Sequence, residues 1–252
     1  MLKVDTDELA ARSSFADALF CEQSWPNSFC DGDFQDCQFV GISFNGSSME
    51  TVIFDHCLFK ACDFNSSQLR SLQFKHCVFY DKEAETGISL KFASIRDCSF
   101  DHCDLTLCDL SRADLYQSKF IECQLTGTNL SHTSAGHIIG ASVTLHEAEF
   151  VDCNLAYADF TGAQMAEVDF SGSRMSHVQL EGADLTAANL SDCELHNIEA
   201  SRVILRNADL RGAAIGGLDI REIDVTGIKI NAEQAIGLLE TLGMILDQGT
   251  ID

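Results

Sequence analysis

Cysteine and histidine are the residues of this sequence best suited to chemistry. The chain has 12 Cys and 8 His among 252 residues, and a His directly precedes a Cys at 56–57, 76–77 and 102–103. Such pairs suggest either zinc ligation or a disulfide framework. No nucleophile elbow, zinc-protease helix, P-loop or dinucleotide fingerprint accompanies them. Their chemistry therefore depends on the elements that position them.

Those elements repeat every five residues. Large apolar side chains stand at every fifth position from residue 34 to 79 and again from 90 to 230, which gives 39 centres. A small residue fills 31 of the 39 places two before a centre, and Asp or Asn often directly precedes the centre. Neither a helix, with a period of 3.6, nor a flat strand, with a period of 2, repeats at five. The period predicts a chain that turns a corner every five residues.

In this register the centre and the small residue two before it point inward. Ten of the 12 cysteines take the small inward place: Cys37, Cys57, Cys62, Cys77, Cys98, Cys103, Cys108, Cys123, Cys153 and Cys193. We predict that they pack as free thiols. His56, His76 and His102 take an outward place, so one metal ion cannot reach both partners of a pair. We therefore predict no metal and no cofactor, and a convex rod without the concave pocket of an enzyme.

The unit A/C-D/N-L/F-x-x, which covers residues 30–230, resembles the pentapeptide-repeat family. This resemblance implies an all-β fold, a right-handed quadrilateral β-helix in which residues 20 apart stack at the strand spacing of roughly 4.8 Å. We divide the chain into an N-terminal cap (1–28), the β-helix (29–230) and a C-terminal helix with a tail (231–252). Within the cap we expect a short helix over residues 6–20.

Two interruptions of the repeat predict loops that project from the rod, at about 80–89 and at 136–147. The centres at 79 and 90 are 11 residues apart, and Ala135 and Gly140 put small residues at centres of the second zone. Loops often carry recognition, although a harmless insertion is the alternative. The first candidate set is Tyr80, Asp81, Lys82, Glu83, Glu85, Thr86 and Gly87. The second candidate set is Gly136, His137, Ile138, Ile139 and His146.

The C-terminal segment predicts an amphipathic helix. Asn231 and Gln234 form a capping box, and Gly243 is a helix stop. One apolar face caps the last coil, and the remaining apolar side chains predict a two-fold contact with a second copy. The candidate dimer residues are Ile236, Leu238, Leu239, Leu242, Met244 and Ile245.

The chain is strongly acidic, with a formal net charge of −23. This charge argues against a nucleic-acid binder, which needs the opposite sign, and favours cationic partners. Residues 141–200 hold 11 acidic residues and a single basic one. The ladder positions predict an acidic surface of Glu149, Asp159, Asp169, Glu199, Asp209 and Asp219. No signal peptide or membrane span is evident, so we expect a soluble, cytoplasmic protein without a membrane partner.

Two segments carry a closer resemblance, to the Qnr-type quinolone-resistance proteins. They are F-Y-D-x-E-x-x-x-G at residues 79–87 and D-I-R-x-x-D-x-x-G-x-K at residues 219–229, within a match over roughly 45–246. The resemblance implies a homodimer joined by the C-terminal helix, an acidic rod that mimics DNA, and loop-assisted protection of DNA gyrase and topoisomerase IV. Residues 1–44 extend beyond the usual start, and the second loop is rich in Gly, Ile and His. The alternative is an acidic scaffold for another protein partner.

Overall fold

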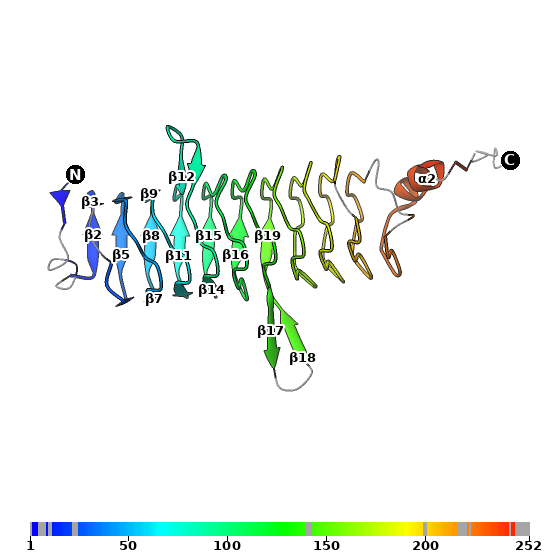
Figure 1. The fold of residues 1–252 in the computed structure, drawn as a ribbon. Helices are drawn as coiled ribbons and strands as arrows, with labels where there is room; N and C mark the ends of the chain where they lie inside the picture. The colour runs from blue at the N-terminus through cyan, green and yellow to red at the C-terminus, as the bar shows by residue number, and fades with distance from the viewer. Residues whose placement is uncertain are drawn as a thin grey trace.

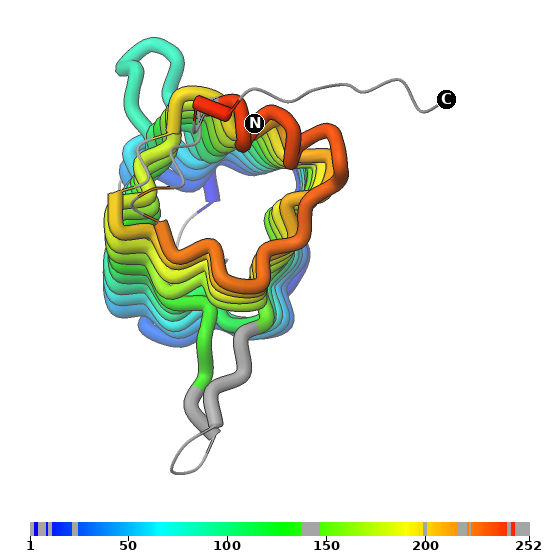
Figure 2. Tube along the Cα trace, turned by 90° about the vertical axis from the view of Figure 1, so that its right-hand side faces the viewer, coloured from blue at the N-terminus to red at the C-terminus, as the bar shows by residue number. Residues whose placement is uncertain are grey.

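The computed structural model describes residues 2–4, 9, 12–21, 25–139, 143–198, 201–215, 221, 223–241 and 243–244. Over this part the chain winds into a four-sided β-solenoid with a hollow-square cross-section of backbone (Figures 1 and 2). The predicted fold, an all-β pentapeptide-repeat solenoid followed by a short helix, is confirmed. We number the faces 1 to 4 in the order in which each coil visits them.

Three faces carry parallel sheets. Face 1 has seven strands, in the order β19 (Glu149–Val151), β16 (Lys119–Ile121), β15 (Ser99–Asp101), β11 (Gln73–Lys75), β8 (Ile53–Asp55), β5 (Asp33–Gln35) and β2 (Ser14–Ala16). Face 2 has β1 (Leu2–Lys3), β3 (Ala18–Cys21), β6 (Gln38–Val40) and β9 (Leu58–Lys60). Face 4 has β14 (Ser94–Arg96), β10 (Gln68–Arg70), β7 (Ser48–Glu50) and β4 (Ser28–Cys30).

Isolated parallel bridges extend the faces where the strands are too short to be named. Face 3 consists of such bridges, from Ser43 through Asp63, Ser89 and Asp109 toward the C terminus. On face 1 the bridges link Glu149, Asp169, Asn189, Asp209 and Lys229. Residues 20 apart therefore stack on one another, as the five-residue period predicts.

The core is built from columns of centre side chains. On face 1, phenylalanine rings stack in consecutive coils with centroids 4.6–5.3 Å apart and interplanar angles of 3–12°. Their residues are Phe15, Phe34, Phe54, Phe74, Phe100, Phe120, Phe150 and Phe170. The constant rise between coils brings identical side chains to stacking distance, so one apolar residue type per column packs without voids.

The cysteines pack beside this column. All ten predicted inward cysteines are buried free thiols. Cys57, Cys77 and Cys123 each donate a hydrogen bond to the backbone carbonyl of the face 1 phenylalanine in the preceding coil, with Sγ···O distances of 3.2–3.4 Å. At the column position of residue 173 the hydroxyl of Ser173 makes the same bond to Phe150, at 2.6 Å. The thiols therefore serve as small core residues, as predicted.

The N-terminal region differs from the sequence prediction. Residues 14–21, which we expected in a helix, form β2 and β3, while the buried Leu9 has helical backbone. Phe15 pairs with Phe34, only 19 residues ahead. The first coil is thus one residue shorter than the others, and this single-residue slip hides the fifth-residue series 15, 20 and 25. The solenoid begins earlier than residue 29, and Trp25 packs against Phe44 at 4.7 Å as part of its core.

Both predicted interruptions form antiparallel hairpins, which project from different corners of the prism (Figure 2). Hairpin 1 consists of β12 (Tyr80–Asp81) and β13 (Thr86–Gly87). Hairpin 2 consists of β17 (Gly136–Ile139) and β18 (Val143–His146). Phe120 pairs with Phe150, 30 residues ahead, so hairpin 2 adds two full periods and the count of five continues through it. Leu145, counted above as a centre, therefore belongs to the hairpin.

The last element is helix α2 (Ala232–Thr241). Asn231 and Gln234 exchange the two predicted capping-box bonds, at 2.8 and 2.9 Å, and Gly243 follows with a φ of 79°. The Gln234 amide also donates to the carbonyls of Leu210 and Ala213, which holds the helix on the last coils. Among the described residues, no helix has the length and apolarity required to cross a bilayer.

Candidate partner-binding surface

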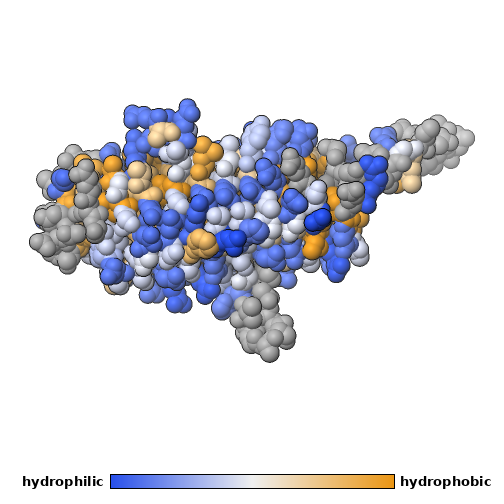
Figure 3. All heavy atoms as spheres, viewed as in Figure 1, coloured by the Kyte–Doolittle hydropathy of each residue, from blue (hydrophilic) through white to orange (hydrophobic). Residues whose placement is uncertain are grey.

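Face 1 gathers the negative charge of the solenoid. The chain enters and leaves this face at two corners, so each coil offers one strand and two corner positions for carboxylates. Five successive coils display nine of them: Asp97, Asp101, Glu122, Glu147, Glu149, Asp152, Glu167, Asp169 and Asp192. Lys119 is the matching cation of these coils, and it pairs with Glu149 at 2.8 Å. Seen from this side, the middle of the molecule is mostly hydrophilic (Figure 3).

The structure divides the acidic residues chosen from the sequence. Glu149, Asp169 and Asp209 stack on face 1, with Asn189 between the last two, whereas Asp159 lies on face 3. Glu199 and Asp219 lie outside the described residues. The carboxylates of Asp159 and Asp169 accept hydrogen bonds from the backbone N–H two residues ahead, at 2.8 and 2.9 Å. These half-buried carboxylates therefore stabilise the turns of the solenoid.

Asp209 is the most strongly neutralised of these residues. Its carboxylate binds the guanidinium of Arg211 at 2.6 Å and has Lys229 at 3.8 Å, and its side chain is only 14% exposed. The hydrogen bonds from Arg211 lower the pKa of Asp209 to about 2. This carboxylate is ionised but offers little free charge to a partner.

The freest carboxylates lie at the corners, two residues after a centre. Glu122, Asp152, Glu167 and Asp192 are exposed there, each with a positive φ of 51–61°. The sequence analysis missed them because it followed the Asp that precedes the centre. Their signal was present as acidic residues at a fixed offset of two from the buried series.

The predicted histidines form a stack at the corner between faces 1 and 2. The rings of His56 and His76 lie 4.7 Å apart, and those of His76 and His102 lie 5.2 Å apart. His102 contacts Asp101 at 2.6 Å and Glu122 at 3.1 Å. The hydrogen bond to Asp101 and the nearby Glu122 carboxylate raise the pKa of His102.

The histidines and cysteines do not share a site. The side chain of His56 is 57% exposed, whereas Cys57 is 1% exposed on the other side of the chain. Within the described residues, no group of three or more His, Cys, Asp or Glu side chains is arranged to hold a metal ion. Burial raises the pKa of Cys62, Cys98 and Cys193 to about 12, so these thiols are not activated nucleophiles.

Hairpin 1 is held by its own turn and by close contact with the next coil. The Asp81 carboxylate accepts the backbone N–H of Glu83 at 2.9 Å, which lowers the pKa of Asp81. Lys60 lies 3.7 Å from the same carboxylate. A Cβ added to Gly87 would overlap the backbone of Leu107, so glycine is required there by the close approach of two chain segments. The predicted loop residues Lys82, Glu83, Glu85 and Thr86 are exposed, whereas Tyr80, Asp81 and Gly87 are half-buried.

Hairpin 2 is described mainly by its backbone. Gly136 pairs with His146, and Ile139 with Val143. The ring of His137 contacts Tyr116 at a centroid distance of 5.1 Å. The side chains of Ile138, Ile139 and His146 lie outside the described part.

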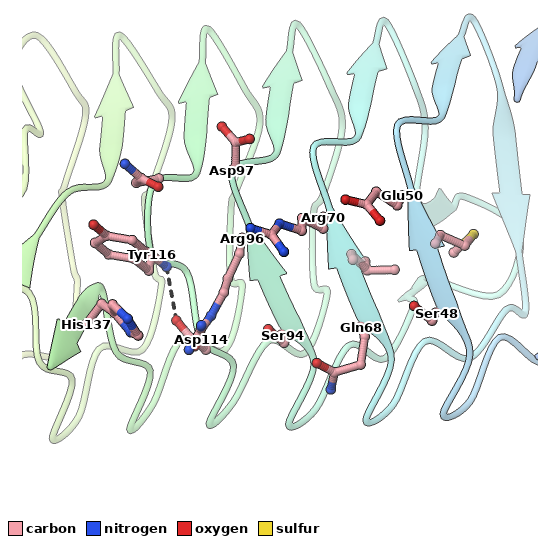
Figure 4. Close-up of a pocket in the computed structure, with 13 residues that line it drawn as sticks. Ser48, Glu50, Gln68, Arg70, Ser94, Arg96, Asp97, Asp114, Tyr116 and His137 are labelled. Carbon is pink, nitrogen blue, oxygen red and sulfur yellow. Dashed lines mark hydrogen bonds and ion pairs between the residues drawn. The ribbon is translucent and has the colours of Figure 1, made fainter. Parts of the chain in front are cut away.

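A groove of about 730 Å³ crosses face 4 beside hairpin 2. Figure 4 shows Glu50, Arg70 and Arg96 along its length, with Tyr116 and His137 at one end. Arg96 pairs with Asp114. Carboxylates thus balance the arginines, and the groove has no strong charge of its own.

The C-terminal helix leaves part of its apolar surface uncovered. Leu238 is buried against the core at 7% exposure, and Leu239 is half-buried. Ile236 and Met244 are 44% and 52% exposed. Leu242 and Ile245, also expected in the dimer contact, lie outside the described residues. Helix α2 therefore caps the last coil with one side and presents apolar side chains on another.

Three kinds of comparison relate this geometry to known proteins. The family model "Pentapeptide repeats" matches eight copies, at residues 86–134, 148–186 and 188–227, which together span half of the chain. None of the curated proteins matches the chain. Among solved structures, full-length QnrB1, described as a plasmid-mediated fluoroquinolone resistance protein, is similar with a TM-score of 0.73 and 26% identity. This match covers 88% of the present chain and 100% of QnrB1.

Two trypsin-treated variants of QnrB1 are similar as well. Their TM-scores are 0.72 and 0.70, each at 26% identity and over 83% of the present chain. The matches cover 98% and 97% of those chains. The likeness extends over the solenoid as a whole.

Proposed function

The chain is a member of the pentapeptide-repeat family, and from this membership, its similarity to QnrB1 and its acidic face 1 we propose that it is a DNA-mimicking protein. It binds the type II topoisomerases DNA gyrase and topoisomerase IV and protects them from quinolones. Its role is that of a binding surface, without catalysis.

The charge density of face 1 carries this proposal. Nine carboxylates lie on five coils, and five coils at roughly 4.8 Å per coil extend over about 24 Å. The mean spacing is thus about 2.7 Å per charge, within a factor of two of the roughly 1.7 Å per phosphate of duplex DNA. A protein groove that binds phosphates through Lys and Arg will therefore be attracted to this face.

The two hairpins supply contacts that an acidic rod alone lacks. They project from different corners (Figure 2), so a partner that encloses face 1 meets hairpin 2 at the corner shared with face 4. Hairpin 1 projects from the corner between faces 2 and 3, next to Leu107. In the proposed complex the hairpins contact the enzyme and destabilise the drug-trapped state. The exposed Ile236 and Met244 of the C-terminal segment join two copies into a homodimer.

A gyrase supercoiling assay with the purified chain tests the proposal. We expect supercoiling to persist in ciprofloxacin when the chain is present. A variant that lacks residues 81–87 should keep the solenoid but protect less well. If neither protein changes the assay, topoisomerase protection is wrong, and face 1 serves as a scaffold for a different cationic protein.

A further inference from the structure

Three large apolar side chains occupy positions that do not favour them. Phe92, Leu107 and Tyr157 are 57%, 46% and 60% exposed, and they stand at corners with φ values of 57°, 55° and 61°. Left-handed backbone favours Gly, Asn or Asp, and bulky side chains are rare there. Exposure to water is a second cost, because these side chains gain little from the core. Such residues suggest a function outside the fold.

The three residues surround face 3. Leu107 and Tyr157 lie on the corner between faces 2 and 3, separated by one coil whose corner residue is Gly127. Phe92 lies on the opposite corner, where the guanidinium carbon of Arg112 is 6.0 Å from its ring centroid. Leu107 leans over the glycine, with a side-chain carbon 2.7 Å from where a Cβ would stand. At the spacing of two coils, Leu107 and Tyr157 are roughly 10 Å apart.

The floor of face 3 between these corners is nearly neutral. Asp109 pairs with Lys91 at 3.0 Å and accepts the N–H of Ser111. In the next coil Asn129 accepts both the N–H and the hydroxyl of Ser131, at 3.0 and 2.7 Å. Because these polar groups are already bonded within the fold, covering them costs less free energy than covering unpaired groups. Face 3 differs in this respect from face 1 and its nine carboxylates.

Hairpin 1 closes one end of this surface. Its return strand packs through Gly87 directly on the backbone of Leu107, so hairpin 1 and the Leu107 corner form one continuous relief. A segment that contacts the hairpin is thereby placed against Leu107. This continuity favours the protein that the hairpin contacts over a second copy of the chain.

We propose that face 3, bounded by Phe92, Leu107, Tyr157 and hairpin 1, is a second docking surface for the topoisomerase. Its occupant is an uncharged segment of the enzyme that presents at least two apolar side chains about 10 Å apart, one for each of Leu107 and Tyr157. This inference rests on the proposed function, because it assigns the segment to the enzyme that face 1 binds. The partner is thus gripped by charge on one face and by apolar contact on another.

The backbone geometry provides a test that separates binding from stability. The triple variant Phe92→Asn, Leu107→Asn, Tyr157→Asn places a residue that tolerates left-handed backbone at each corner. We expect an unchanged or higher Tm, an affinity for purified DNA gyrase at least tenfold weaker, and an unchanged salt dependence, because no charge is altered. The control Ala187→Asn changes an exposed corner with a φ of 57° outside face 3, and it should bind like the wild type.

Each outcome has one meaning. If the wild type does not bind gyrase, the proposed function and this inference are both contradicted. If the wild type and the triple variant bind equally well, the docking role of face 3 alone is wrong. A lower Tm would assign the three residues to folding, and a changed oligomeric mass in light scattering would assign face 3 to contact between copies; either result overturns the inference.

Discussion

The corner residue of each repeat is where this chain varies its surface. The inward residues form uniform columns of Phe, Leu, Ala and Cys, whereas the corners carry glycine, carboxylates, histidines and aromatic rings in turn. Left-handed backbone disfavours most side chains by about 1–2 kcal/mol. Each non-glycine corner is therefore a position where the solenoid tolerates a local cost, and the surface chemistry of the protein concentrates there.

The buried thiols give the first residue-scale prediction. In the native protein we expect Ellman's reagent to modify the exposed Cys30 and, more slowly, the half-buried Cys21. The other ten cysteines should react only after denaturation, because burial removes access and raises their pKa values, to about 12 for Cys98. Rapid modification of ten or more thiols under native conditions would contradict this packing.

The histidine stack gives a second prediction, on pH. Because Asp101 and Glu122 raise the pKa of His102 in the folded chain, protonation and folding favour each other. This stabilisation is fully present below the unfolded pKa and is lost as the pH rises through the folded pKa. An NMR titration should give His102 a midpoint above that of an unfolded reference peptide. The shift should fall in Glu122→Gln, and an identical midpoint in peptide and protein would refute the contact.

At the scale of elements, the hairpins are insertions whose ends must fit the spacing of the coils. Hairpin 1 leaves after the buried Phe79 and returns at the buried Ile88. Hairpin 2 leaves after the buried Ala135 and returns at the buried Ala148. Each hairpin thus begins and ends at an inward residue, so the core is continuous through both interruptions.

Gly87 tests this requirement. Replacement by Ala would force a Cβ into the backbone of Leu107 and Cys108, and we expect a loss of about 1–3 kcal/mol in the free energy of unfolding. Gly237→Ala is the matched control, because no atom lies within 4 Å of an added Cβ in helix α2. That change should stabilise the protein by roughly 0.5–1 kcal/mol. Urea unfolding of both variants measures the difference, and equal effects would rule out the close approach.

At the scale of the molecule, the faces differ in chemistry although they share one fold. Face 1 is acidic, face 3 is nearly neutral between apolar corners, and face 4 carries arginines balanced by carboxylates. The solenoid keeps these surfaces at fixed mutual angles (Figure 2). A partner that recognises two faces at once therefore reads the cross-section of the rod as well as its charge.

The C-terminal helix predicts the assembly of the molecule. Ile236→Glu places a charge on the exposed side of α2, away from Leu238 and Gln234, which hold the helix on the last coil. We expect a dimer for the wild type and a monomer for this variant in light scattering. The stability of the single solenoid should change by no more than about 0.5 kcal/mol. A monomeric wild type, or a dimeric variant, would contradict the contact.

Much of this architecture follows from the five-residue period. The period predicts the inward cysteines, the stacking of residues 20 apart and the position of hairpin 1, and local motifs predict the capping box of Asn231 and Gln234. Each of these depends on backbone geometry that repeats along the chain. A repeat pattern therefore determines the direction of a side chain as well as its neighbours.

The misses have equally physical causes. The coil of Phe15 lacks one residue, so a count that demands a constant phase stops at Phe34. Hairpin 2 adds two whole periods, so the count runs through it unbroken. The residue pattern also cannot show that Asp169 is engaged by a turn N–H while Asp152 remains exposed, because this depends on corner geometry.

The most direct test of the account is the affinity of DNA gyrase for this chain as a function of salt. The face 1 variant Glu122→Gln, Asp152→Asn, Glu167→Gln, Asp192→Asn is compared with a control of equal charge, Glu50→Gln, Glu181→Gln, Glu194→Gln, Glu240→Gln. We predict that wild-type affinity falls by at least about tenfold between roughly 50 and 200 mM salt. The face 1 variant should bind more weakly with a flatter slope, and the control should resemble the wild type. Equal affinities and slopes for all three proteins would contradict the mimicry of DNA by face 1.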